Sequence, residues 1–450
     1  MAHYFFIGIA GTGMSAIAQY LAGSGHSVSG SDRLFSSDSK MLIQEQFELA
    51  GIKCYFQDGS GVTLDVDKVV VSTAIEATNN EYQLAEQLGI PIMKRSELLA
   101  QLSAEKKTIA VGGTSGKSTT SAMIFHILET NGFSPSLMSG AGLSSLQRKG
   151  LPGNAWVGQS EWLVIEADES DGSIINYVPE ISVVLNLDRD HKELDELVQL
   201  FETFKLHTRT SFIVNDDSLI LHPLSVDRQC DFGTKNGVGF QGENFSQQGF
   251  QISFSINNTS FKVPVIGRHN MENALAAVAV CVAAGASIAQ CATALETFEG
   301  IYRRTELIGE RNGVYVVDDF AHNPSEIAAA IRACQSVGKA VHAWFQPHGY
   351  GPLRFMRPDL VHEVSEVLRT TDYFYLSDVY YAGGTVNKDV TSADVLKDLE
   401  LHTSQAVLAE NRDDLLAAIK QRLHAGDVIL LMGARDPSLA DFARNLLQQL

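Results

Sequence analysis

The stretch from Ala110 to Met123 reads AVGGTSGKSTTSAM and contains a glycine-rich turn of the form G-x-x-G-K-S. Apolar residues before the turn predict a buried strand, and apolar residues at helical spacing after it predict a helix. Glycines let backbone N–H groups close around phosphate oxygens, and a helix N-terminus adds partial positive charge. A glycine turn that only joins a strand to a helix is the alternative, but the Lys-Ser pair favours nucleotide binding.

Two side chains of this turn have chemistry suited to a nucleoside triphosphate. Lys117 is long enough to reach the outer phosphates, and the hydroxyl of Ser118 is a suitable Mg²⁺ ligand. The loop is shorter than the common G-x-x-x-x-G-K-[ST] form. The candidate ATP-binding residues of the loop are Gly113, Thr114, Gly116, Lys117, Ser118 and Thr119.

The composition is that of a globular protein and argues against two classes of partner. With 450 residues, 45% of them hydrophobic, the chain is long enough for two to four domains. A net charge of −19 argues against nucleic-acid binding, and the sequence contains no apolar run long enough to span a membrane. The first residues predict no signal peptide, and the five scattered cysteines predict reduced thiols. We therefore expect a cytoplasmic protein, either a monomer or a homodimer.

The N-terminal segment predicts a second nucleotide-binding unit. An apolar strand over residues 4–9 runs into Gly8-Ile-Ala-Gly11-Thr-Gly13, and a helix follows. Asp32 ends the next strand, about 20 residues further on, where a dinucleotide fold places its ribose-binding acid. Binding of NAD, binding of a UDP-type nucleotide and simple strand–helix packing all remain open. The candidate residues are Gly11, Thr12, Gly13 and Asp32.

Acidic residues follow the next strong apolar strand of the middle segment, residues 162–165. Glu166 abuts that strand, and a carboxylate at a strand end beside a phosphate loop suits Mg²⁺. Four acids in six residues cannot all be ligands, so a solvated acidic loop is the alternative for each of the others in Glu166-Ala-Asp-Glu-Ser-Asp171, and it is the favoured interpretation for Asp171. His191 follows the next strand and is a candidate ligand or neighbour of the metal. The predicted metal set is Ser118, Glu166 and His191.

The remaining candidates lie further along the chain. Residues 212–266 alternate short strands with polar turns and predict an antiparallel accessory sheet. Asn270 and Asn273 lie one helical turn apart and are expected to face a ligand together, although Asn270 fits helix capping equally well. Arg304 and Asp319 flank a strand and so could meet one nucleotide.

Strands and helices alternate along almost the whole chain, which predicts an α/β fold. We expect three domains, with residues 1–105 binding the UDP-type substrate, residues 106–299 binding ATP and residues 300–450 binding an amino acid. A charged linker is predicted over residues 103–107.

Taken together, the motifs resemble the Mur ligase family. The matching blocks, in order, are GIAGTGMSAIA, SGSD, STAI, GTSGKSTT, EADESD, NLDRDH, GRHNMENALAA, FEGIYRR, VDDFAHNPSEI and FQPH. The resemblance covers almost the whole chain. It implies a Rossmann-like N-terminal domain, a central P-loop ATPase and a Rossmann-like C-terminal domain.

The resemblance also implies an activity. It predicts an ATP-dependent amide ligase that joins an amino acid, L-alanine in the branch most similar to this chain, to the carboxylate of UDP-N-acetylmuramate in peptidoglycan precursor synthesis. It implies catalytic roles for Lys117, Glu166 and His191. It places ATP against Asn270, Asn273, Arg304 and Asp319, and the UDP moiety against Gly11, Gly13 and Asp32. Candidate acceptor-binding residues are His322, His348 and Arg354.

Several positions depart from the alanine-adding pattern. Ser115 stands where that branch usually has His, Phe320 stands in place of Tyr, and Asn323 in place of a second His. The arginine expected directly after FQPH is absent, with Arg354 further on. The acceptor is therefore open between alanine, a recycled murein tripeptide and another group. A regulatory homologue that senses nucleotides is a non-catalytic alternative, and a nicotinamide oxidoreductase would leave the phosphate loop unexplained. Lys205 is a candidate for carbamylation.

Overall fold

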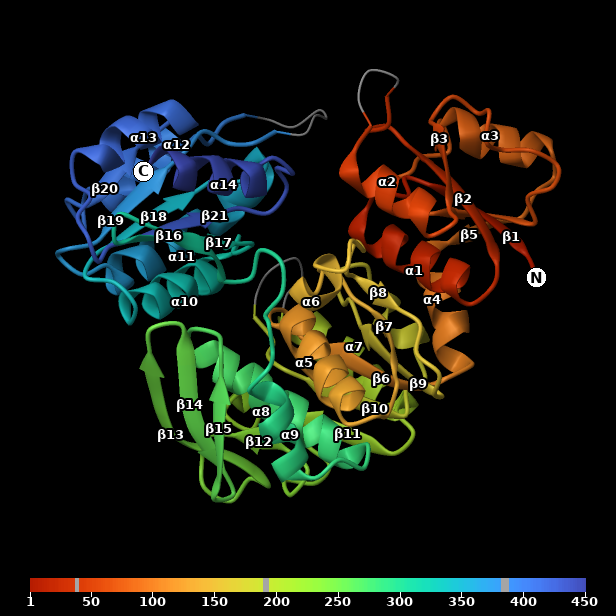
Figure 1. Ribbon diagram of the computed structural model, residues 1–450, viewed down its shortest axis with the longest axis horizontal. Helices are drawn as coiled ribbons and strands as arrows, with labels where there is room; N and C mark the ends of the chain where they lie inside the picture. The colour runs from red at the N-terminus through yellow and green to blue at the C-terminus, as the bar shows by residue number, and fades with distance from the viewer. Residues whose placement is uncertain (37–39, 189–193, 382–387) are drawn as a thin grey trace. The chain divides into compact units, whose positions relative to one another are not determined.

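Three sheets with helices on their faces form the main framework, as the computed structural model shows for residues 1–36, 40–188, 194–381 and 388–450 (Figure 1). The chain divides into two compact units. The first comprises residues 1–243, 255–261 and 272–301, and the second comprises residues 244–254, 262–271 and 302–450. The predicted α/β class is confirmed.

The N-terminal sheet is parallel and has the strand order β3-β2-β1-β4-β5. Its central strand β1 is an apolar run because it is buried on both faces. The strand order reverses at β1, and ligands of such sheets bind outside the carboxyl ends of the strands at this point. The strands are β1 (His3–Ile7), β2 (Ser27–Asp32), β3 (Lys53–Phe56), β4 (Lys68–Val71) and β5 (Ile92–Lys94), and the helices are α1 (Thr12–Gly23), α2 (Leu42–Leu49), α3 (Asn80–Gln87) and α4 (Arg95–Ala104).

The middle sheet has the order β11-β10-β6-β9-β7-β8 and is parallel except for β8. Its register aligns Val111 with Glu166 and Gly112 with Val184, so three strands end at one edge. The strands are β6 (Lys107–Gly112), β7 (Ser136–Met138), β8 (Ala155–Trp156), β9 (Trp162–Glu166), β10 (Ile181–Val184) and β11 (Ser211–Val214). The helices are α5 (Lys117–Thr130), α6 (Ser144–Gln147), α7 (Leu194–His207), α8 (Arg268–Ala283) and α9 (Ile288–Leu295), with 3₁₀ turns η1 (Ser173–Asn176) and η2 (Leu219–Leu224).

Two sequence predictions about this part of the chain are wrong in detail. The linker predicted over residues 103–107 is shorter than expected, because α4 continues to Ala104 and β6 begins at Lys107, which leaves two residues between them. The accessory sheet is not antiparallel throughout, because β12 pairs with β13 in parallel. Its strands, in the order β12-β13-β14-β15, are β12 (Phe232–Gly233), β13 (Phe240–Gln248), β14 (Gln251–Ile256) and β15 (Thr259–Val263).

The C-terminal sheet has the order β16-β17-β21-β18-β19-β20, and only the edge strand β16 is antiparallel to its neighbour. Apolar side chains are packed on both faces of this sheet. The strands are β16 (Glu306–Arg311), β17 (Val314–Asp319), β18 (Val341–Phe345), β19 (Tyr373–Leu376), β20 (Ala406–Leu408) and β21 (Val428–Met432), and the helices are α10 (Pro324–Gln335), α11 (Tyr350–Val367), α12 (Ser392–Leu399), α13 (Arg412–Lys420) and α14 (Leu439–Gln449).

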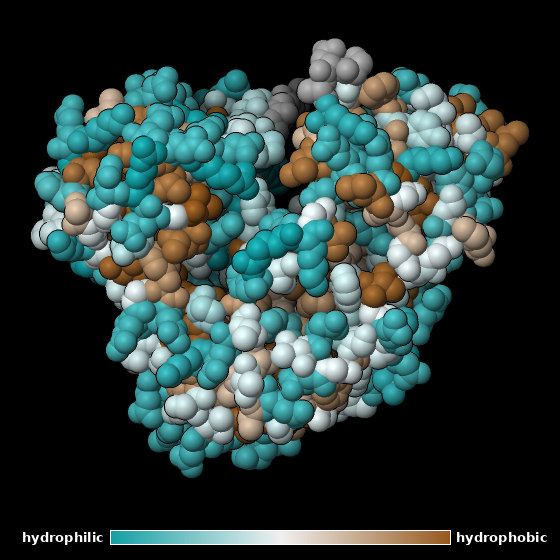
Figure 2. Space-filling view, in the orientation of Figure 1, coloured by the Kyte–Doolittle hydropathy of each residue, from teal (hydrophilic) through white to brown (hydrophobic). Residues whose placement is uncertain are grey.

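The surface carries both polar and apolar residues, as expected from the composition of the chain. On the face drawn in Figure 2, hydrophilic residues predominate and apolar residues form small groups between them. Within the described ranges, no helix combines the length and the apolar character needed to cross a membrane.

Candidate active site

The phosphate loop connects β6 to α5 and relies on two glycines with positive φ. Gly113 has φ +130° and Gly116 has φ +87°, values that side chains rarely tolerate. A Cβ on Gly116 would lie 2.4 Å from Oδ1 of Asn273. The loop therefore requires glycine at this position for conformational and for steric reasons, and Lys117 follows as the first residue of α5.

Asn186, two residues after the end of β10, holds this loop in place. Its Oδ1 accepts the N–H of Ser115 at 2.8 Å and its Nδ2 donates to the carbonyl of Ser115 at 3.0 Å. Its own carbonyl accepts the N–H of Thr114 at 3.1 Å. Asn186 thus supports the backbone of the loop whichever side chain stands at position 115.

Lys117 is largely buried and lies against an acidic neighbour. Its Nζ donates to the carbonyl of Gly113 at 2.6 Å and forms an ion pair with Glu169 at 2.9 Å. Burial opposes the charged form of Lys117, but Glu169, Asp168 and Glu166 outweigh it, so the pKa of Lys117 lies above its usual value. Burial raises the pKa of Glu169 more than Lys117 lowers it. The lysine is a cation at neutral pH.

Glu166 is held by three donors at the end of β9. Its Oε2 accepts the hydroxyl of Ser118 at 3.1 Å, and its Oε1 accepts the hydroxyl of Ser139 at 2.7 Å and the N–H of Gly140 at 2.5 Å. The structure thus brings together two of the three predicted metal-binding residues. The third, His191, lies outside the described residues. Among the described residues, no group of three or more His, Cys, Asp or Glu side chains is arranged to hold a metal ion.

The glycine turn of the N-terminal sheet is fixed by the end of β2. The N–H groups of Gly8 and Ile9 donate to the carbonyl of Ser31 at 2.8 and 3.0 Å. Both carboxylate oxygens of Asp32 accept backbone N–H groups, from Ala10 at 2.9 Å and from the residue two positions after Asp32 at 3.0 Å. The predicted residues Gly11, Thr12, Gly13 and Asp32 therefore lie together at the start of α1.

The two asparagines of α8 have different surroundings. Asn273 is buried, and its Oδ1 accepts the hydroxyl of Thr120 at 3.3 Å. Thr120 lies on α5, the helix that follows the phosphate loop. Asn270 is also buried, and its Nδ2 donates to the carbonyl of Ile266 at 2.7 Å. Because α8 begins at Arg268, Asn270 lies in the first turn and is not the residue that caps the helix.

A second group of predicted residues lies in the second unit, at the end of β17. Asp319 is buried, and its Oδ1 accepts the N–H of Ala321 at 2.6 Å. Burial raises the pKa of Asp319 to about 6, although Arg304 opposes the shift. The guanidinium groups of Arg304 and Arg303 lie 4.8 and 5.5 Å from the ring centre of Phe320. Two cations therefore stack near the aromatic residue that replaces the expected tyrosine.

His322 and His348 lie close together beside this group. Their ring centres are 5.4 Å apart, and Nδ1 of His322 lies 3.2 Å from Oε2 of Glu326. Burial lowers the pKa of His322, but the carboxylate of Glu326 outweighs it, so the pKa lies above the usual value. Asn323, which replaces a second histidine, caps α10 by accepting the N–H of Glu326 at 2.9 Å.

Two further predicted residues are at the surface. Arg354 forms an ion pair with Asp389, and both side chains are about half exposed. Lys205 is partly exposed on α7. Neither position adds a buried charge to the two groups of site residues.

Sequence reasoning missed three residues that build the first site. The sequence leaves Glu169 open between a ligand and a solvated loop residue, whereas the structure buries it in an ion pair with Lys117. Its place in a run of acids beside a phosphate loop could have indicated a partner for the lysine. Ser139 carries no sequence signal, and Asn186 opens the NLDRDH block without any sign of its contact with the loop, because both contacts depend on the strand order of the sheet.

Comparisons with known proteins agree with this architecture. Residues 3–107 match the model described as "Mur ligase family, catalytic domain", residues 111–281 match "Mur ligase middle domain" and residues 303–435 match "Mur ligase, glutamate ligase domain". The chain is 35% identical to the UDP-N-acetylmuramate–L-alanine ligase of Pelotomaculum thermopropionicum, over 96% of this chain and 95% of that protein. It is 34% identical to the ligase of the same name from Nostoc punctiforme, over 96% and 93%.

Solved structures show the same arrangement of elements. The UDP-N-acetylmuramate–alanine ligase MurC of Thermotoga maritima matches with a TM-score of 0.81 at 25% identity, over 100% of this chain and 99% of that one. A murein peptide ligase from Psychrobacter arcticus matches with a TM-score of 0.67 at 23% identity, over 100% and 98%, which supports the fold alone. On these matches and on the phosphate loop described above, the chain belongs to the Mur ligase family of ATP-dependent ligases.

Proposed function

We propose that this enzyme joins an amino acid, with L-alanine as the first candidate, to the carboxylate of UDP-N-acetylmuramate in peptidoglycan precursor synthesis. The observation that carries the proposal is the pairing of Lys117 with Glu169 and of Ser118 with Glu166 at one end of the middle sheet. This arrangement lies in a chain that aligns over 96% of its length with alanine ligases. An ATP site beside a carboxylate-bearing UDP-sugar suits activation of that carboxylate by phosphorylation.

The phosphate loop would hold ATP in this proposal. The loop N–H groups and Lys117 would bind the phosphates, and Asn273 would lie against the same loop. Ser118 and Glu166 present hard oxygen donors within 3.1 Å of each other, a donor set that suits Mg²⁺, with His191 as a further candidate. When bound, Mg²⁺ would neutralise charge on the phosphates. Asn270, Arg304 and Asp319 are further proposed contacts of ATP.

The proposed reaction proceeds in two steps. A carboxylate oxygen of the UDP-sugar attacks the γ-phosphorus of ATP, the bond to ADP breaks, and an acyl phosphate forms. The amine of the acceptor then attacks the acyl carbon, loses a proton, and displaces inorganic phosphate through a tetrahedral intermediate. Lys117 would offset the repulsion between the two anions in the first step.

The two substrates other than ATP would bind to separate groups of residues. The turn with Gly11, Thr12 and Gly13, supported by Asp32, would take the UDP moiety. The acceptor would meet His322 and His348, and the positive charge favoured on His322 suits a carboxylate. Arg354 is already paired with Asp389, so the geometry favours the histidines over it.

The remaining expectations belong to the same proposal. We infer functional domains over residues 1–105, 106–299 and 300–450. We also infer a cytoplasmic enzyme that is a monomer or a homodimer and does not bind nucleic acid or membranes. A tripeptide acceptor is the alternative substrate, because Asn323 serves as a helix cap and Phe320 as a cation-stacking residue in places where the alanine-adding branch has His and Tyr.

Phosphate release from ATP tests the proposal. The full-length protein is assayed with UDP-N-acetylmuramate and, separately, with L-alanine, other amino acids and the murein tripeptide, over a titration of Mg²⁺. We expect release that requires the UDP-sugar, Mg²⁺ and an acceptor. Release with the tripeptide and not with alanine would assign the recycling reaction. No release with any acceptor would refute the ligase assignment proposed here.

A further inference from the structure

A buried asparagine links the UDP-binding turn to the phosphate loop inside the first unit. Asn154 directly precedes β8 and is only 5% exposed. Its Nδ2 donates to the carbonyl of Thr12 at 2.9 Å and to the hydroxyl of Ser15 at 2.7 Å, and its Oδ1 accepts Nε2 of Gln19 at 2.8 Å. One side chain of the middle segment therefore binds three residues in the first two turns of α1.

The backbone of the same residue supports the other site. The carbonyl of Asn154 accepts the N–H of Ser139 at 2.9 Å. Ser139 is buried, and its hydroxyl donates to Glu166 at 2.7 Å, while Glu166 also accepts the hydroxyl of Ser118. An unbroken series of hydrogen bonds thus runs from the start of α1 through Asn154 and Ser139 to Glu166 and the phosphate loop.

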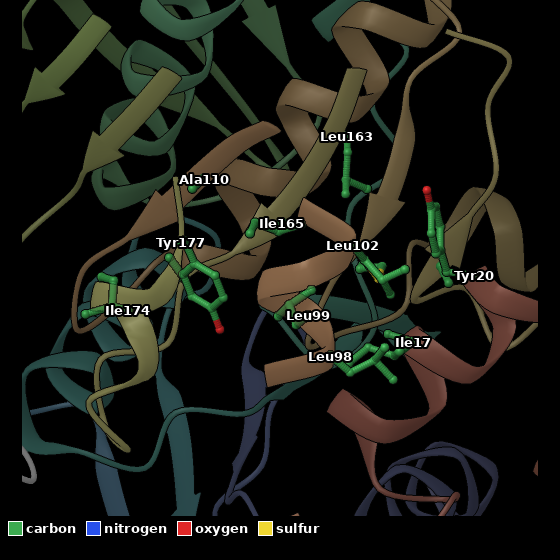
Figure 3. Packing of buried hydrophobic residues seen from close by; sticks show 14 of the residues in the cluster. Ile17, Tyr20, Leu98, Leu99, Leu102, Ala110, Leu163, Ile165, Ile174 and Tyr177 are labelled. Carbon is green, nitrogen blue, oxygen red and sulfur yellow. The ribbon is translucent and has the colours of Figure 1, made fainter. Parts of the chain in front are cut away.

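Apolar packing brings the same elements together but does not specify their register. Figure 3 shows Ile17 and Tyr20 of α1 and three leucines of α4 in one cluster with Leu163 and Ile165 of β9. The hydrophobic effect is nearly non-directional, so such a surface tolerates small shifts of a helix along a sheet. Hydrogen bonds to a buried amide depend on distance and angle and allow one position.

We propose that Asn154 is a positioning residue that holds the UDP-binding turn in register with Glu166 and the phosphate loop. The inference rests on the proposed function, because it assigns UDP to the turn and ATP to the loop. The sugar carboxylate must reach the γ-phosphate, and a misplacement of about 1 Å is enough to cost roughly 100-fold in rate. A side chain that touches neither substrate can therefore determine how well they meet.

Steady-state kinetics of Asn154→Ala test the role. The substitution removes all three side-chain hydrogen bonds to α1 and leaves the backbone bond to Ser139 available. We expect kcat/KM for UDP-N-acetylmuramate to fall about 10- to 100-fold while KM for ATP changes less than about twofold. Binding of UDP alone, measured by calorimetry, should weaken about tenfold. Asn131→Ala, which removes a side-chain bond to the carbonyl of Ile127 on α5, is the matched control and should leave both values unchanged.

A second variant covers the case in which Asn154→Ala does not fold. Asn154→Asp keeps the shape and the acceptor for Gln19, but it loses the Nδ2 donor to Thr12 and Ser15, where only the Ser15 hydroxyl can turn to donate instead, so an intermediate loss is expected. Normal kinetics in these variants, or KM values for ATP and for the UDP-sugar that rise equally, would overturn the positioning role. If the wild-type enzyme binds UDP but releases phosphate with none of the acceptors, the proposed function alone is refuted. The positioning role of Asn154 is then decided by whether Asn154→Ala weakens the binding of UDP. A wild-type protein that neither binds UDP nor ligates would overturn both.

Discussion

The phosphate loop and the end of β17 each contain a buried charged group, and opposite effects determine the two pKa values. Lys117 lies 2.9 Å from Glu169 with two more carboxylates nearby, and their attraction outweighs burial. Asp319 has Arg304 as its cationic neighbour, whose guanidinium stacks near Phe320, and burial outweighs the attraction. A buried group keeps its charge only where the attraction of nearby opposite charges outweighs the free-energy cost of desolvation.

The difference bears on how each group would respond to a ligand. The ammonium group of Lys117 stays charged near neutral pH and can exchange Glu169 for a phosphate without a change in its own protonation. Asp319 titrates near pH 6, so its charge depends on what lies beside it. The comparison predicts a pH-insensitive lysine in the first unit and a pH-sensitive carboxyl group in the second.

The largest effect is expected at the lysine. Lys117→Ala should lower ATP-dependent phosphate release by about 100- to 1000-fold, because it removes the cation that would offset the charge of the phosphates. Lys107→Ala is the control, since Lys107 pairs with Glu161 at the surface, at the start of β6, the strand that leads into the phosphate loop. Because Glu169 is left buried without its partner, Lys117→Ala/Glu169→Gln is assayed beside it, with circular dichroism to check folding. Substantial residual release from a folded variant would contradict the role of Lys117.

A smaller effect, on stability, is expected at Asp319. Its pKa rises from an ordinary value of 3.8 to about 6 on folding, so the folded state binds more protons than the unfolded state between pH 4 and 6. The contribution of Asp319 to stability therefore falls as pH rises through this range and levels off above it. Urea unfolding at several pH values measures the free energy of unfolding of Asp319→Asn and of the wild type. The difference, variant minus wild type, should rise with pH by up to about 3 kcal/mol.

The control for this prediction is an exposed acid of the same unit. Asp441→Asn alters a carboxylate that is 76% exposed and pairs with Arg444, so its curve should run parallel to that of the wild type. A parallel curve for Asp319→Asn as well would show that burial does not dominate at the end of β17.

The smallest effect is expected at His322, where a close carboxylate again outweighs burial. Glu326→Gln should lower the pKa of His322, because it removes the negative charge 3.2 Å from Nδ1. Titration of the imidazole signals by NMR, assigned with His322→Gln, measures the shift. Glu363→Gln, at a partly exposed pair with Arg332, should leave that signal unchanged. An unaltered pKa in Glu326→Gln would mean that burial governs this position too.

Local sequence was enough to predict the secondary structure around the main motifs. The strand, glycine turn and helix at residues 108–123, and the acids at strand ends such as Glu166 and Asp319, follow from short patterns. The predicted fold class is confirmed, whereas the ion pair of the buried Glu169 was not predicted and the linker predicted over residues 103–107 is reduced to two residues. Propensity and spacing describe a residue's neighbours in the chain but not its partners across a sheet.

Partners distant in the sequence explain the remaining differences. Asn154 lies 142 residues from Thr12, and nothing in its surroundings in the chain indicates a hydrogen bond to α1. Ser139 meets Glu166 only because β7 lies beside β9 in the middle sheet. Both contacts are set by strand order and register, which depend on the whole core.

By itself, the sequence determined the phosphate loop, because glycine conformation and helix start are local properties of residues 112–118. It also determined the order of the α/β units, because apolar runs and turns have their own periodicity. Only the tertiary structure decided that Glu169 pairs with Lys117, that Asp319 is buried enough to shift its pKa, and that Asn154 forms hydrogen bonds with α1. Burial and long-range hydrogen bonds exist only after the chain has packed, so no local pattern encodes them.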